Sequence, residues 1–287
     1  MSSERYIVSL IKLLDDEDSF VARTAYEKLM CLDPSHAPLI SKYRENANPR
    51  LKVLLDEVID SLRYKGYIDA VVDYFKNDGE DFERGAFLVA KFAYPDVNFK
   101  SYSEILDLMA VDLRKRLYTK EDTLDVIEAV NRFFFFEKGF RGNFENYYEP
   151  DNSYINRVID RKIGIPITLS LVYILVGKRI NLPVYGIGMP GHFIVKYESN
   201  GFEIFIDPFN GGRLLSRSEC ERLLSQLGYV PKDDYFRRAT AKEVVKRMFG
   251  NLVLAYRNNG YVDKANKLIE IIKLVESFDE NLHAHRR

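Results

Sequence analysis

A histidine and an aspartate at the ends of two neighbouring apolar segments are the residues most able to do acid–base chemistry. His192 opens the segment 192–197, and Asp207 closes the segment 202–207. Both segments are rich in β-branched and aromatic residues, which predicts strands, and Ser199-Asn200-Gly201 between them predicts a turn. An imidazole that is held by a carboxylate can act as a general base. His192 and Asp207 are therefore the candidate catalytic pair, with Asp207 orienting His192.

The register of this hairpin decides how the two side chains meet. If residues 200–201 form a two-residue loop, Asp207 faces an apolar isoleucine, which is a poor partner. If Tyr197 instead pairs with Phe202, His192 lies directly opposite Asp207, with Cβ atoms roughly 4.5–5.5 Å apart. We expect the second register. Both registers keep the two side chains on one face, because a two-residue shift conserves the alternation of a strand.

An attacking group is harder to find than a base. Pro166 is expected as the first residue of an apolar helix that continues over 167–178, and it supplies neither a nucleophile nor an amide donor. Thr168 and Ser170 follow in the first turn, where a hydroxyl more commonly caps the helix or bonds a backbone carbonyl. Cys220 has acidic neighbours that disfavour a thiolate. Thr168 is kept as a catalytic candidate, and Ser170 or an activated water as its alternatives.

The residues around these groups carry a family resemblance. The motifs are Asn152-Ser153-Tyr154, Gly164-Ile165-Pro166, Pro190-Gly191-His192-Phe193 and Ile206-Asp207-Pro208-Phe209. Together they resemble the SirB1 family, a branch of the transglutaminase-like superfamily, over about half of the chain. In that superfamily a cysteine at a helix start attacks an acyl group, and the next strands supply a histidine and then an aspartate. The resemblance implies that Pro166 stands in the place of the cysteine.

The same resemblance implies a binding cleft around the catalytic pair. Its candidate residues are Asn152, Ser153, Pro166 and Gly191, and Asn152 is a candidate amide donor. The alternative for Asn152 is an Asx-turn or a helix N-cap. A cleft of this kind suits a protein or peptide partner.

The order of elements predicts an α+β fold, because helices come first and strands later. We expect a helical segment at 1–82, a transglutaminase-like domain with an antiparallel sheet at 83–235, and a helical hairpin with a tail at 236–287. The first segment resembles a HEAT-type repeat, and an ordinary helical bundle is the alternative. The hairpin, with a turn at 258–260, resembles one tetratricopeptide unit. A single unit cannot bury both faces, so it should pack against the preceding domain.

Composition restricts the class of protein. The chain has 287 residues, of which 46% are hydrophobic and 30% charged, with a net charge of −1. These values are typical of a soluble globular protein and give no overall attraction to nucleic acid or to a membrane. Two distant cysteines, Cys31 (expected in the core) and Cys220, and no apolar leader favour a cytoplasmic location. No spacing is typical of a zinc site or phosphate loop, so neither a metal nor a cofactor is expected.

Three classes of function remain open. The first is a pseudoenzyme that has lost its nucleophile and binds a protein or peptide, in a regulatory role. The second is an acyl-transfer or hydrolytic enzyme that uses Thr168, Ser170 or water with His192 as base. The third is a structural module, in which His192 and Asp207 are buried without an adjoining cavity. The sequence leaves the partner, the substrate and the oligomeric state open.

Overall fold

The computed structural model describes residues 3–120 and 122–284, and the chain divides into two compact units. The N-terminal unit lies within Met1–Asp73 and the C-terminal unit within Tyr74–Arg287. Within the described residues, none of the helices combines the length and apolar character that crossing a bilayer requires.

The N-terminal unit is helical. Its helices are α1 (Ser3–Leu13), α2 (Ser19–Met30), α3 (Ala37–Arg44) and α4 (Pro49–Asp73). The Asp18 side chain caps α2 by accepting from the Phe20 amide, and side chains such as Leu29 and Leu55 fill a core between the helices. Cys31 lies at the C-cap of α2 and is exposed. The expectation of a core position for Cys31 was wrong, because the helix ends there and its apolar stripe ends with it.

The C-terminal unit contains eight α-helices and six strands among its described residues. The helices are α5 (Phe82–Lys91), α6 (Phe99–Leu117), α7 (Thr123–Asn131), α8 (Ile155–Arg161), α9 (Pro166–Arg179), α10 (Arg217–Gln226), α11 (Ala241–Asn258) and α12 (Val262–Ala284). Two short strands, β1 (Arg141–Gly142) and β2 (Ile163–Gly164), pair in parallel. The main antiparallel sheet has the order β3 (Val184–Ile187), β4 (Ile194–Ser199), β5 (Phe202–Asp207) and β6 (Arg213–Leu215). The fold is α+β, as the order of elements predicted.

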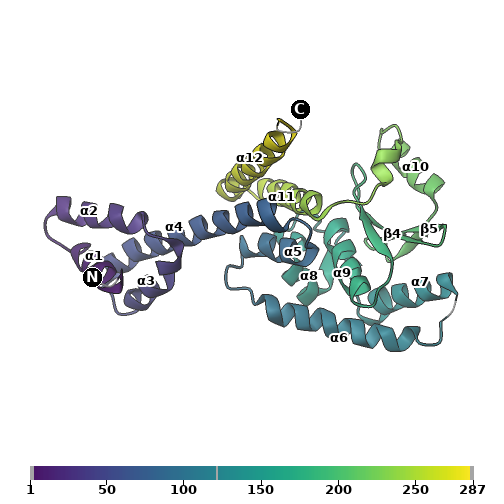
Figure 1. Cartoon of the computed structure of the whole chain (residues 1–287), viewed down its shortest axis with the longest axis horizontal. Helices are drawn as coiled ribbons and strands as arrows, with labels where there is room; N and C mark the ends of the chain where they lie inside the picture. The colour runs from purple at the N-terminus through teal and green to yellow at the C-terminus, as the bar shows by residue number, and fades with distance from the viewer. Residues whose placement is uncertain (1–2, 121, 285–287) are drawn as a thin grey trace. The chain divides into compact units, whose positions relative to one another are not determined.

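Helix α9 is the central element of this unit. It packs against α6 and α8 and also against β3 and β4, and Figure 1 shows it between α6 and the sheet. Residues 166–177 are all buried, which fits a helix that is apolar on nearly every side. Pro166 is its first residue, where the missing amide hydrogen costs no hydrogen bond.

The β4–β5 hairpin has the register that we did not expect. Tyr197 pairs with Ile204 and Ser199 with Phe202, so the predicted pairing of Tyr197 with Phe202 was wrong. The loop consists of two residues, Asn200 with φ 50° and Gly201 with φ 78°. Left-handed conformations at both loop positions give a turn whose twist matches that of the strands, and Asn-Gly is the pair that adopts them most readily.

The C-terminal helical hairpin packs against the rest of its unit. Helices α11 and α12 pack on each other, and α11 also contacts α5 and the segment before α8. The hydroxyls of Tyr154 and Tyr256 lie 2.7 Å apart in the interior. The hairpin therefore buries its inner face on the preceding domain, as a single helical pair must.

Candidate functional site

His192 and Asp207 meet at the edge of the main sheet. His192 lies in the β3–β4 loop, two residues before β4, and Asp207 is the last residue of β5. Nε2 of His192 lies 2.8 Å from Oδ2 of Asp207. A tight turn presents the histidine, since the His192 amide donates to the Met189 carbonyl and Gly191 has φ 73°. The pair forms although the hairpin register differs from the predicted one, because both registers place His192 and Asp207 on the same face of the sheet.

Asp207 is held as a carboxylate by several donors. Oδ1 accepts from the amides of Phe209 and Asn210, and Oδ2 also accepts from Nδ2 of Asn210 at 2.8 Å. Burial alone would raise the pKa of Asp207, but the hydrogen bonds from His192 and Asn210 and the charge of His192 hold it below its ordinary value. When His192 is uncharged, an ionised Asp207 accepts the hydrogen carried by Nε2. Nδ1 of His192 is then the nitrogen that can accept a proton or a hydrogen bond.

The pair borders a cavity of about 300 Å³. The His192 side chain is 17% exposed and that of Asp207 only 3%, so the imidazole is the member that a ligand can reach. Leu223, Leu224 and Leu227 form an apolar wall. The polar part of the lining consists of His192, Asp207, Asn210, Arg213 and Gln226. The structural-module interpretation predicted no adjoining cavity, and on this point it was wrong.

The candidate hydroxyls lie elsewhere. Thr168 is fully buried, donates to the Asn152 carbonyl at 2.7 Å, and accepts from the Ile165 amide at 3.2 Å. Ser170 is also fully buried, and its nearest partner is the Phe193 carbonyl at 3.4 Å. Neither residue lines the cavity of His192. The Thr168 hydroxyl thus joins the helix start to the segment before α8, and the Ser170 hydroxyl faces the residue just before β4.

The cleft residues implied by the resemblance are only partly brought together. Gly191 lines the cavity, whereas Asn152, Ser153 and Pro166 are buried and do not. The Asn152 amide donates to the carbonyls of residues 146 and 147, so it organises the loop before α8 instead of facing a ligand. Its backbone carbonyl receives the Thr168 hydroxyl.

Cys220 is an inert thiol in this arrangement. It is completely buried in α10. Burial, together with the nearby carboxylates of Glu219 and Asp207, raises its pKa to about 12. A thiol with such a pKa carries almost no thiolate near neutral pH.

Two further residues support the pair and were not among the residues predicted from the sequence. Asn210 bonds both oxygens of Asp207, and the Asp-Pro-Phe-Asn sequence is a turn signal that would have found it. Arg247 on α11 donates from Nη2 to the His192 carbonyl at 2.8 Å. No local signal identifies Arg247, because it approaches from 55 residues away. Across the described residues there is no cluster of three or more histidine, cysteine or acidic side chains able to hold a metal ion.

Comparison with known proteins identifies the family that the chain resembles. The model of the transglutaminase-like superfamily matches residues 100–250. A UPF0162 protein of Xylella fastidiosa (strain 9a5c) is 34% identical over 206 residues, which cover 69% of this chain and 73% of the relative. F-box only protein 21 of Homo sapiens is 29% identical over 184 residues, 61% of this chain but 27% of that protein. No solved structure matches the chain significantly. The family match covers more than half of the chain and includes both His192 and Asp207, and the chain therefore belongs to the transglutaminase-like superfamily.

Proposed function

We propose that the chain is a SirB1-type, non-catalytic member of this superfamily, and that it binds a peptide segment of a partner protein in a regulatory role. One observation carries the proposal. Among the described residues that line the cavity of His192 and Asp207, none is a cysteine, serine, threonine or lysine. Acyl transfer through a covalent intermediate needs such a group within hydrogen-bonding reach of the base, roughly 2.6–3.2 Å.

The lining of the cavity supports a peptide as the ligand. Its leucine wall offers apolar contact, and His192, Asn210 and Gln226 offer hydrogen bonds to a peptide backbone. A few well-placed polar groups in an apolar pocket are the usual composition of a binding site. The segment that follows α10 extends the apolar surface, since Leu227, Tyr229 and Val230 are 55%, 43% and 75% exposed. Helical elements at both ends of the chain, HEAT-like and tetratricopeptide-like in sequence, are common in interaction proteins, which is an argument from analogy.

Selection of random displayed peptides on the full chain tests the proposal. Enriched peptides, resynthesised with a fluorescent label, should bind the protein, and Leu227→Asp should weaken binding at least about tenfold, or about 1.4 kcal/mol. Leu254→Asp is the matched control, because Leu254 is 50% exposed and lies on α11 outside the cavity lining. No enrichment, or equal losses in both variants, would contradict the proposal.

Hydrolysis by water is the second candidate function. It is favoured by the hydrogen bond from Nε2 to Asp207, which leaves Nδ1 of His192 able to take a proton from a water molecule. Acyl probes that react with thiols or hydroxyls, together with chromogenic esters and peptides, distinguish the two functions. Labelling or turnover that His192→Ala abolishes would establish catalysis and overturn the binding proposal.

A further inference from the structure

A second cavity, of about 360 Å³, also borders the loop that presents His192. The two cavities share Met189, Pro190 and Gly191, so this loop forms a wall of both. The second cavity is completed by residues of α11 and of the segment before it. Ligand pockets run from about 300 to 1,000 Å³, and each cavity is at the small end of this range. One extended ligand that crosses the loop is a natural way to fill both.

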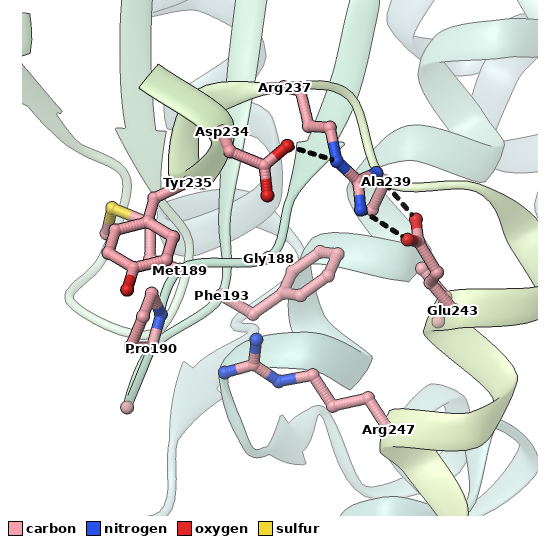
Figure 2. A pocket seen from close by; sticks show the side chains of 12 residues that line it. Gly188, Met189, Pro190, Phe193, Asp234, Tyr235, Arg237, Ala239, Glu243 and Arg247 are labelled. Carbon is pink, nitrogen blue, oxygen red and sulfur yellow. Dashed lines mark hydrogen bonds and ion pairs between the residues drawn. The ribbon is translucent and has the colours of Figure 1, made fainter. Parts of the chain in front are cut away.

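The two arginines of this cavity have different surroundings. Arg237 donates from Nε to Asp234 at 3.0 Å and from Nη1 to Glu243 at 2.9 Å, so its charge is already balanced. Arg247 has no carboxylate partner among the described residues. Glu243 lies one helical turn before Arg247 on α11, where an ion pair is common, but its carboxylate is turned to Arg237 (Figure 2).

The guanidinium of Arg247 is held in place by a hydrogen bond and still faces the second cavity. Nη2 is bonded to the His192 carbonyl, and the carbon of the guanidinium lies 5.6 Å from the centre of the Phe193 ring. Figure 2 shows it extending from α11 into the space beside Phe193 and Pro190. Burial lowers the pKa of Arg247, and Tyr147 opposes this only in part. The side chain nevertheless stays charged, because an arginine does not lose its proton in proteins. A partly buried cation without a counter-ion is unfavourable, and an anionic ligand group relieves it.

We propose that Arg247 makes this second cavity a carboxylate-binding subsite, which takes the carboxylate of the same peptide whose neighbouring residues occupy the cavity of His192. This inference rests on the proposed peptide-binding function and specifies the chemistry of the peptide. A guanidinium presents paired N–H donors that match the two oxygens of a carboxylate. Through its bond to the His192 carbonyl, Arg247 also couples the two subsites.

The test uses the full chain and fluorescent octapeptides derived from the selected sequences. Each peptide is made with a free C-terminus, with a C-terminal amide, and with its Asp and Glu residues replaced by Asn and Gln. At least one replacement should weaken binding to the wild-type protein about tenfold or more, since hydrogen bonds to charged groups are worth this much. Loss with the amide identifies a terminal carboxylate as the ligand group, and loss with Asn or Gln identifies a side-chain carboxylate.

Arg247→Gln should abolish that preference, so that the acid and neutral peptides bind alike. Arg257→Gln, a charge loss at an exposed position on the same helix, should leave the preference intact. The ratio of the two affinities is the readout, because a mere shift of the His192 loop weakens both peptides equally. If the wild-type protein binds peptides but does not prefer the acid forms, the subsite is refuted and the peptide-binding function stands. If no peptide binds, both proposals fail.

Discussion

Asp207 bonds Nε2 of His192, and this choice of ring nitrogen decides what the imidazole can do. When Asp207 is ionised and the imidazole is uncharged, Nε2 carries the hydrogen and Nδ1 carries the lone pair. In an enzyme, that lone pair would take a proton from an attacking group. In a site whose described lining has no cysteine, serine, threonine or lysine, the same lone pair can accept a hydrogen bond, for example from a peptide N–H. One oriented imidazole thus suits either proton transfer or ligand binding.

The Asp207 carboxylate should stabilise the fold in a pH-dependent way. Its folded pKa is lowered, so the unfolded state takes up its proton first as the pH falls. The contribution is complete well above the unfolded pKa of about 3.9 and is lost as the pH falls through the lower folded value. At pH 7, Asp207→Asn should reduce the free energy of unfolding by about 1.5–3 kcal/mol. Urea unfolding of the wild-type protein and of Asp207→Asn between pH 7 and pH 3 measures this difference in the free energy of unfolding.

The difference between wild type and Asp207→Asn should shrink below about pH 4. Asp96→Asn, at an exposed carboxylate of the same unit, corrects for the general effect of losing a negative charge. A difference that stays constant over the whole pH range would show that Asp207 is not held as a carboxylate.

At the scale of elements, the start of α9 depends on Thr168. Its hydroxyl accepts from the Ile165 amide and donates to the Asn152 carbonyl, and it joins the helix to the loop before α8. A Cβ at position 164 would lie only 2.8 Å from Oγ1 of Thr168. Glycine therefore fits at this position because it has no side chain. The first turn of α9 is thus fixed by buried hydrogen bonds and tight packing.

Thr168→Val keeps the shape of the side chain and removes the hydrogen bonds of the hydroxyl to Ile165 and Asn152. We expect it to lower the free energy of unfolding by about 1–3 kcal/mol, because a buried amide and a buried carbonyl lose their partner. Thr168→Ser keeps the hydroxyl and loses one methyl group, which is worth about 0.8 kcal/mol, so it should cost less. Denaturant unfolding compares the three proteins. Unchanged stability in Thr168→Val would mean that the hydroxyl is not structural and would revive its candidacy as a nucleophile.

Local sequence patterns predicted where helices, strands and turns lie better than they predicted how the strands pair. The strands at 184–187 and 202–207, the start of α9 at Pro166 and the turn at 258–260 follow from β-branched runs and from the special conformations of proline and glycine. The hairpin register was mispredicted because side-chain pairing was weighed above the turn. The expected register would have placed Lys196 directly opposite Glu203, and in the observed register Nζ of Lys196 still lies 3.5 Å from Glu203 across a diagonal.

The candidate site was predictable only where the chain brings its own neighbours together. His192 and Asp207 are joined by one hairpin, so alternation along the strands was enough to pair them. Whether Asn152 faces a ligand or its own loop depends on where the loop folds back, which no periodicity encodes. Arg247 reaches His192 through the packing of α11 on the rest of the unit, and only the tertiary structure reveals it.

At the scale of the whole molecule, each unit has a core of its own. The core cluster of the N-terminal unit consists of side chains between Ile7 and Leu62, all from that unit. In the C-terminal unit, α11 buries residues such as Phe249 against its neighbours. We therefore expect the two units to unfold as separate cooperative units, because stability follows the burial of apolar surface within each of them.

Two core substitutions test this independence. Leu55→Ala, at a fully buried position of the N-terminal unit, should destabilise that unit by about 2–5 kcal/mol, and Phe249→Ala should destabilise the C-terminal unit by about 3–5 kcal/mol. Hydrogen exchange followed by mass spectrometry resolves the two, since faster exchange should be confined to the core amides of the substituted unit. Peptide binding should survive Leu55→Ala, because its cavities lie wholly within the C-terminal unit. If either substitution accelerates exchange equally in both cores, the chain unfolds as one cooperative body and the helical N-terminal unit is part of the scaffold that holds His192.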